Sequence, residues 1–369
     1  MSELRQSLID DLEAAIATKS IGDRATMLRR VTDLFLMSSG QLDDEKLGVF
    51  DTVMTRLLDE LESSARATFG HILATVPDAP PATVRALASD FDIEVAGPLL
   101  TFSERLNDRT LVELASTGGQ KHLLAISKRR QLAEPVTDIL VTKGDHEVAI
   151  STVRNRGAAF SEQGYATLVA RSTNDPDLAR GIWLRPEIPR QHLLTLFAQA
   201  SETVRRQLTH EDPSKAGVIL EIVAKASQQI RDHSRRHSPR FADAYASVQS
   251  LYFANALGET ELVGYAGSDK FEETLAALSL MCDLPIDLVE RTFIEERSEQ
   301  LIVMAKASGL SWGTVKALLR SKARLYSRPV QDFEKSLETF NRLNPDTARK
   351  AIGFYRLRQR SLKAAATHH

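Results

Sequence analysis

Apolar residues recur at intervals of three and four positions along most of the chain, which is the spacing of one face of an α-helix. Leu4, Leu8, Leu12 and Ile16 show this spacing near the start. The alternation of apolar and polar residues that is typical of a half-buried strand is hard to find. The pattern therefore predicts an all-α protein.

A two-helix pattern returns at a fixed interval from about residue 54. The expected first helices begin at Pro81, Asp108, Glu134, Ser161 and Ile188, which lie 27, 26, 27 and 27 residues apart. The expected second helices lie at 92–100, 119–127, 145–153, 175–183 and 201–208. A unit of this kind buries its apolar face by stacking on its neighbours. We expect a right-handed α-solenoid of short helix pairs, similar to HEAT and armadillo arrays, with additional N- and C-terminal helices.

A short phrase marks the start of several second helices. It reads "DIEVA" at 92–96, "DHEVA" at 145–149 and "DPDLA" at 175–179. An aspartate at this place can accept hydrogen bonds from the free amides of the first helical turn, which contributes about 1 kcal/mol. We therefore expect Asp92, Asp145 and Asp175 to be N-caps, and the phrase to reflect stacking and not a reaction centre.

The remainder of the chain is also helical in pattern. Two longer helices are expected at 215–236 and 239–255, and the segments 273–293 and 299–319 align at an offset of 26 residues. The predicted domains are an N-terminal helical cap over 1–53, HEAT-like repeats over 54–210, a C-terminal region with further helix pairs over 211–325, and a basic C-terminal helix with a frayed tail over 326–369.

Composition narrows the class of protein. The chain is 43% hydrophobic and 26% charged, with a net charge of -2, which fits a folded protein whose surface as a whole is not built for nucleic acid. Residues 1–63 carry 13 acids against 7 bases, whereas 313–369 carry 13 bases against 4 acids. The single cysteine, Cys282, lies in an apolar run and is expected in the core. No signal peptide or transmembrane segment is expected, and a cytoplasmic location fits best.

One ordered set of segments resembles a known family. It comprises "RRVTDLFL", "DIEVAGPLL", "HLLAIS", "VTDILVTKGDHEVAISTVRNRGAAFSEQGYATLVA" and "RPEIP". These segments resemble the bacterial family called domain of unknown function 2336, well over roughly residues 25–210 and loosely elsewhere. The resemblance implies an all-helical, HEAT-like bacterial protein, and it brings no catalytic residues with it.

The sequence nominates no catalytic, cofactor or metal site. "HEVAI" at 146–150 begins like a zinc-protease motif but has Ile150 where the second histidine must stand. His233 and His237 share a helix face, yet four arginines crowd them and no neighbouring acid or thiol completes a metal site. Glycine-rich phosphate-binding loops and nucleophile elbows are absent. We expect no enzymatic activity, no cofactor and no metal.

A row of basic residues follows the repeat near the ends of the second helices. It comprises Lys128, Arg129, Arg154, Arg156, Arg180, Arg205 and Arg206. Stacked in parallel, these would form a ladder suited to an acidic protein segment or a phosphate backbone. The alternative is that cations at helix C-termini only complement the helix dipole. A second basic segment, with Arg356 and Arg358 among apolar residues, could bind a partner or simply cover the last repeat.

The leading hypothesis is a non-enzymatic scaffold or adaptor that binds another protein through an extended helical-repeat surface. The alternative is a binder of nucleic acid or of an anionic nucleotide ligand through the arginine row. An enzyme acting on nucleic acid is a third possibility, for which no residue is nominated. The acidic start and basic end of the chain could also pair within one chain or between two copies, as in a homodimer.

Overall fold

The computed structural model describes residues 21–38, 43–58, 61–295, 297–327 and 333–354. Every regular element among them is a helix, so the all-α class is confirmed. The β-type pairing in the described part is an isolated bridge between Leu132 and Ala158. No described helix is long and apolar enough to cross a membrane. The chain forms two compact units, which divide between Gly164 and Tyr165. The predicted domain boundaries at 53, 210 and 325 stay predictions.

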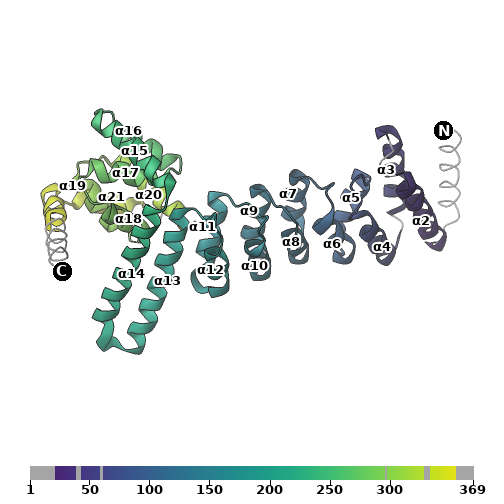
Figure 1. The fold of residues 1–369 in the computed structure, drawn as a ribbon, viewed down its shortest axis with the longest axis horizontal. Coiled ribbons are helices and arrows are strands. Elements are labelled where there is room, and N and C mark those ends of the chain that lie inside the picture. The colour runs from purple at the N-terminus through teal and green to yellow at the C-terminus, as the bar shows by residue number, and fades with distance from the viewer. Residues whose placement is uncertain (1–20, 39–42, 59–60, 296, 328–332, 355–369) are drawn as a thin grey trace. The chain divides into compact units, whose positions relative to one another are not determined.

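The first unit consists of helices joined by short turns (Figure 1). They are α2 (Ile21–Ser38), α3 (Asp44–Leu58), α4 (Ser63–Leu73), α5 (Pro81–Ala88), α6 (Ile93–Phe102), α7 (Asp108–Thr117), α8 (Gln120–Ser127), α9 (Glu134–Lys143) and α10 (His146–Arg154). Three predicted starts, Pro81, Asp108 and Glu134, coincide with the observed ones. Proline costs no hydrogen bond in a first turn, and Pro81 and Pro135 mark two of these three starts.

Consecutive helix pairs of the first unit stack on each other. The second helices α4, α6, α8 and α10 contact in series, and α3 contacts α5 as α7 contacts α9. Each second helix buries apolar residues against its neighbours, such as Val95 and Leu99 of α6 and Val148 of α10. Burial of one such side chain contributes about 1.5–3 kcal/mol. The stack is therefore held by neighbour-to-neighbour apolar contact.

The recurring phrase has the structural role that was predicted. The Asp92 carboxylate accepts a hydrogen bond from the Glu94 amide, Asp145 from Val148 and Asp175 from Leu178, each at 3.0 Å. Asp92 also accepts a hydrogen bond from the Ser63 hydroxyl of the preceding pair. The repeated letters thus mark helix N-caps.

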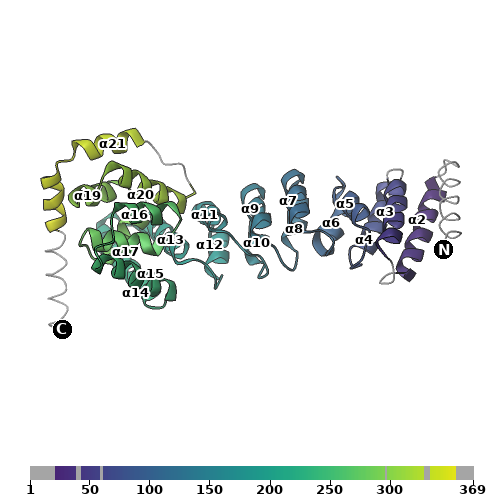
Figure 2. The same ribbon diagram turned by 90° about the horizontal axis from the view of Figure 1, so that it is seen from above.

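The second unit begins with a further short pair, continues with the long helices α13, α14 and α15, and ends with mostly short helices (Figure 2). Its helices are α11 (Glu162–Arg171), which starts just before the division, α12 (Pro176–Trp183), α13 (Arg190–Glu211), α14 (Ala216–Arg236), α15 (Pro239–Phe253), α16 (Glu259–Gly267), α17 (Phe271–Met281), α18 (Ile286–Ile294), α19 (Glu299–Ala307), α20 (Trp312–Leu325) and α21 (Phe333–Arg342). The alignment at offset 26 is reflected in the core, because Leu275 and Leu301, and likewise Val289 and Val315, are fully buried. Cys282 is buried beside them, as expected.

One predicted helix boundary is wrong. Residues 201–208 were expected to be a separate second helix, but they continue α13, which runs unbroken from Arg190 to Glu211. The junction at 198–202 contains neither glycine nor proline, so nothing in the backbone stops the helix. Consequently α13 and α14 form a long antiparallel hairpin whose turn lies at Pro213 (Figure 1).

Candidate functional site

The predicted arginines of the first unit have two different roles, and Arg129 is structural. Its guanidinium donates to the carbonyl oxygens of Leu100, at 2.8 Å, and Ser103, at 2.7 Å, both at the C-terminal end of α6. Burial lowers the pKa of Arg129, and Asp108 and Glu104 oppose that shift. An arginine held in this way caps a neighbouring helix and is not presented to a ligand.

The same kind of contact recurs one pair later. The Asn155 side-chain amide donates to the carbonyl oxygens of Ser127, at 2.8 Å, and Arg129, at 2.6 Å, at the C-terminal end of α8. Residues 129 and 155 are 26 positions apart, which is the repeat spacing. Each of these second helices therefore has its last carbonyls satisfied by a side chain of the next pair, an inter-pair cap.

Exposed cations surround these caps in the first unit. Lys128, Arg130, Arg154 and Arg156 are exposed, and none forms an ion pair with another described residue. The Asn155 contacts place the end of α10 against the end of α8, which brings the four cations to one edge. We call these four residues the basic edge.

The remaining predicted cations have different local surroundings. Arg180 is exposed on α12 of the second unit. Arg206 lies inside α13, because the short second helix predicted at 201–208 is part of that longer helix. The guanidinium of Arg206 lies 3.9 Å from the Glu202 carboxylate. Arg205 pairs with the same glutamate. Arg356 and Arg358 lie outside the described residues.

A buried ion network lies in the second unit, where the sequence predicted nothing. Arg190 of α13 pairs with Glu272 of α17 at 2.8 Å and with Glu290 of α18. Arg235 of α14 pairs with Asp287 and, at 3.4 Å, with Glu290. The Glu290 side chain is 0% exposed and that of Arg190 only 7%. Four helices are thus tied together by charges that water barely reaches.

Burial governs the electrostatics of this network. It raises the pKa of both Glu272 and Glu290, and the nearby Arg190 opposes the shift in each case. Burial likewise lowers the pKa of Arg231, which lies on α14 beside Glu290. Because both carboxylates are bound by guanidinium groups, they hold the four helices together.

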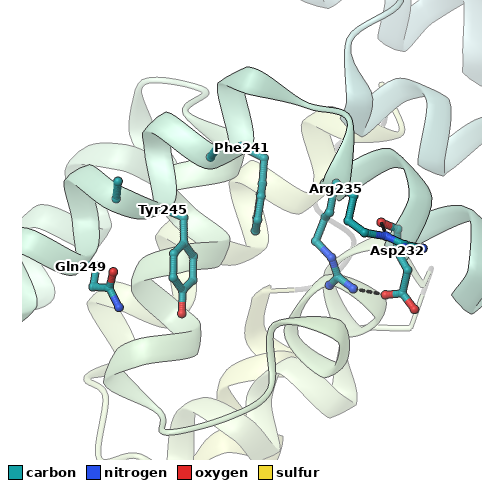
Figure 3. A pocket seen from close by; sticks show the side chains of 8 residues that line it. Asp232, Arg235, Phe241, Tyr245 and Gln249 are labelled. Carbon is teal, nitrogen blue, oxygen red and sulfur yellow. Dashed lines mark hydrogen bonds and ion pairs between the residues drawn. The ribbon is translucent and has the colours of Figure 1, made fainter.

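A groove of about 800 Å³ opens beside the network, between α14 and α15 (Figure 3). Its lining includes Arg235, Phe241, Tyr245 and Gln249. The side chain of Arg235 lies at one end, where it pairs with Asp232, and the two aromatic rings stand along the groove (Figure 3). Arg190 also stacks on the Phe241 ring, 5.2 Å from its centroid. The charge of Arg235 is therefore already neutralised within the unit.

No three histidine, cysteine, aspartate or glutamate side chains among the described residues converge as metal ligands. The rings of His233 and His237 lie 4.2 Å apart, but Nδ1 of His237 is hydrogen-bonded to the His233 carbonyl oxygen at 2.9 Å. These two histidines end a basic helix.

Among the described residues of the second unit, the α13–α14 hairpin carries the largest group of exposed aliphatic side chains. They are Val204, Leu208, Val218, Leu220 and Ile222, with exposed fractions of 46%, 42%, 59%, 57% and 61%. No residue of α14 is buried, although the helix is strongly amphipathic. The hairpin extends away from the helices that form the core of the unit (Figure 1).

Comparison with known proteins identifies the family. A family model described as an uncharacterised protein conserved in bacteria, DUF2336, matches residues 95–353, more than half of the chain. The chain belongs to the DUF2336 family. No curated protein and no solved structure matches the chain.

The DUF2336 match confirms the resemblance but shifts its extent. It begins within α6 and continues through α21, so it covers the hairpin and the ion network, which the quoted sequence segments did not. The sequence contains one signal for this network, in the positions of Glu272 and Glu290. Each stands in an apolar helix, and Glu290 shares the helix face of Ile286 and Phe293.

Proposed function

We propose that this DUF2336 protein is a non-enzymatic scaffold or adaptor of the cytoplasm that binds another protein through its helical surface. The observation that carries the proposal is the exposed aliphatic surface of the α13–α14 hairpin. The largest exposed apolar patch on a protein, typically a few hundred Å², is often a functional surface. The sequence alone assigned binding to the repeats, whereas this surface lies on the hairpin that follows them.

We also propose the finer form of the fold, a right-handed, HEAT-like α-solenoid over the repeats. The serial contacts of α4, α6, α8 and α10 and the spacing of 26 and 27 residues support it. Such arrays present extended surfaces to partners, which agrees with an adaptor role.

The hairpin offers a matched pair of variants to test protein binding. Residues on an α-helix are 100° apart, so Leu220 lies on nearly the opposite side of α14 from Val218 and Ile222, with similar exposure. The full chain would be immobilised and partners captured from a bacterial lysate would be quantified by mass spectrometry. We expect Val218→Glu with Ile222→Glu to lose specific partners and Leu220→Glu to keep them. Capture of the same proteins by both variants would contradict the assignment.

A second candidate function rests on the basic edge, which suits an anionic polymer. Binding of a single-stranded oligonucleotide would be followed by fluorescence anisotropy at several salt concentrations. If Arg154 and Arg156 each neutralise one phosphate, their joint reversal to glutamate reduces the slope of log affinity against log salt by about 1.4. Arg109→Glu, on the exposed side of α7, is the control. An unchanged slope would remove the candidate.

A further inference from the structure

Four of the exposed aliphatic residues form one face of the hairpin. Leu208 and Val218 each lie five positions from Pro213 in the turn, and Val204 and Ile222 each lie nine positions from it. In an antiparallel hairpin, residues equally far from the turn lie at the same level. The four side chains therefore form two rows of two, one helical turn apart.

Helix geometry places both rows on the same side of the hairpin. Val218 and Ile222 come one residue before Ile219 and Val223, which are half-buried toward α13. On α13, Val204 and Leu208 likewise come one residue before half-buried Arg205 and Thr209. A step of one residue turns a helix by 100°, and in antiparallel helices this step leads from the contact line to the same side of the pair. Leu220 belongs to the other side.

We propose that this face, the residues Val204, Leu208, Val218 and Ile222, binds the same face of a second copy of the chain. The inference rests on the proposed protein-binding function and names the partner. A square of four aliphatic side chains on two antiparallel helices is half of two layers of a four-helix bundle, and a second square completes both layers. A two-fold contact requires a self-complementary surface, and two equal rows satisfy that requirement.

Charge complementarity also favours a second copy. The face contains no charged residue, so two copies meet without like-charge repulsion at its centre. Glu221 and Lys225 border it on α14, one helical turn apart, and Glu211 borders it on α13; none of the three is ion-paired with a described residue. An edge with charges of both signs can pair with its own copy, whereas an edge of one sign would repel it.

The exposed area predicts a reversible dimer. Four half-exposed aliphatic side chains present on the order of 200 Å² of apolar surface per copy. A standard interface buries about 800 Å² per partner, so the apolar part of this contact is only about a quarter of that area. We therefore expect a weak, transient dimer with a dissociation constant of about 100 µM or higher.

Sedimentation velocity of the full chain, over a concentration series from about 10 µM to about 1 mM, tests the proposal. The wild-type chain is expected to shift from monomer to dimer with concentration, and Leu220→Glu is expected to shift in the same way. The double variant Val218→Glu with Ile222→Glu is expected to stay monomeric, and circular dichroism confirms that each variant is folded. Copper-induced crosslinking of Val218→Cys, but not of Leu220→Cys, is the second readout, since the native Cys282 is buried.

Two results would overturn the second-copy proposal. One is a chain that stays monomeric at every concentration, and the other is a dimer that survives the double variant. If the chain is monomeric while the double variant still abolishes capture of another protein from a lysate, the partner is that protein, and the protein-binding function stands. If neither self-association nor capture depends on the face, both proposals fail.

Discussion

Replacing Arg129 with alanine separates its capping role from a ligand-binding one. The substitution removes two hydrogen bonds from a charged donor and leaves the carbonyl oxygens of Leu100 and Ser103, both fully buried residues, without that partner. Hydrogen bonds from charged groups contribute about 1.5–3 kcal/mol each. Because the guanidinium is partly exposed, we take the low end and expect a loss of about 2–3 kcal/mol for the pair.

Hydrogen exchange measured by mass spectrometry on the full chain is the appropriate assay, because stability in a stack of repeats is local. A loss of 2–3 kcal/mol speeds exchange of the α6 and α8 amides by about 30- to 150-fold. The exchange rates of Arg129→Lys are expected to lie between those of the wild type and Arg129→Ala, because one ammonium group cannot replace the several donors of the planar guanidinium. Arg154→Ala, the exposed control, is expected to change stability by less than about 0.5 kcal/mol.

The reasoning would be refuted if Arg129→Ala and Arg154→Ala gave the same exchange rates in α6 and α8. It would also be refuted if Arg129→Ala left those rates unchanged but abolished oligonucleotide binding. The second result would restore Arg129 to the binding role that its position in the basic row first suggested.

Three further predictions follow from named contacts. Arg190→Ala leaves two buried carboxylates without their main partner and is expected to destabilise the second unit by about 3–5 kcal/mol. Both tryptophans, Trp183 and Trp312, lie in that unit, so a thermal melt followed by their fluorescence should show a lower midpoint, and an unchanged midpoint would contradict the network. Gly157→Ala places a Cβ 1.8 Å from a backbone carbonyl oxygen, so faster exchange around the turn at 155–159 is expected, and wild-type protection there would argue against the close approach. Hydrogen bonds from the Ser63 hydroxyl and the Glu94 amide lower the pKa of Asp92 in the folded chain. The ionised Asp92 carboxylate therefore stabilises the fold above its ordinary pKa of about 3.9, and this stabilisation is lost as the pH falls through the lowered pKa of the folded state. The stability difference between wild type and Asp92→Asn should therefore narrow below about pH 4, and a constant difference across that range would exclude the linkage.

The short helix pairs could be predicted because their signals are local. Pro81 and Asp145 mark helix starts by chemistry that acts within one turn, and the fixed spacing repeats the evidence. The boundary expected at Ser201 failed for the same reason, since a serine inside good helix-forming sequence does not end a helix. Arg190 and Glu290 are 100 residues apart, so their contact depends on the tertiary fold and leaves no periodic trace.

The candidate site was less predictable than the fold. Spacing alone brought Arg129 and Arg154 into one row, but it could not distinguish a guanidinium bound to carbonyl oxygens from one open to solvent. The hairpin face was hidden for another reason. Val218 and Ile222 look like ordinary core positions of an amphipathic helix in the sequence. They are exposed because no other described element packs on this side of the hairpin, which the sequence of the helix does not reveal.

The inter-pair caps make the order of synthesis matter. The carbonyl oxygens of Leu100 and Ser103 leave the ribosome 29 and 26 residues before the arginine that caps them, and those of Ser127 and Arg129 wait 28 and 26 residues for Asn155. A nascent chain that stops between two pairs therefore ends in a helix with open acceptors. Truncation from the C-terminus should for that reason also unfold the last helix pair that remains, because the side chain that caps it has been removed. Truncation from the N-terminus leaves these caps complete.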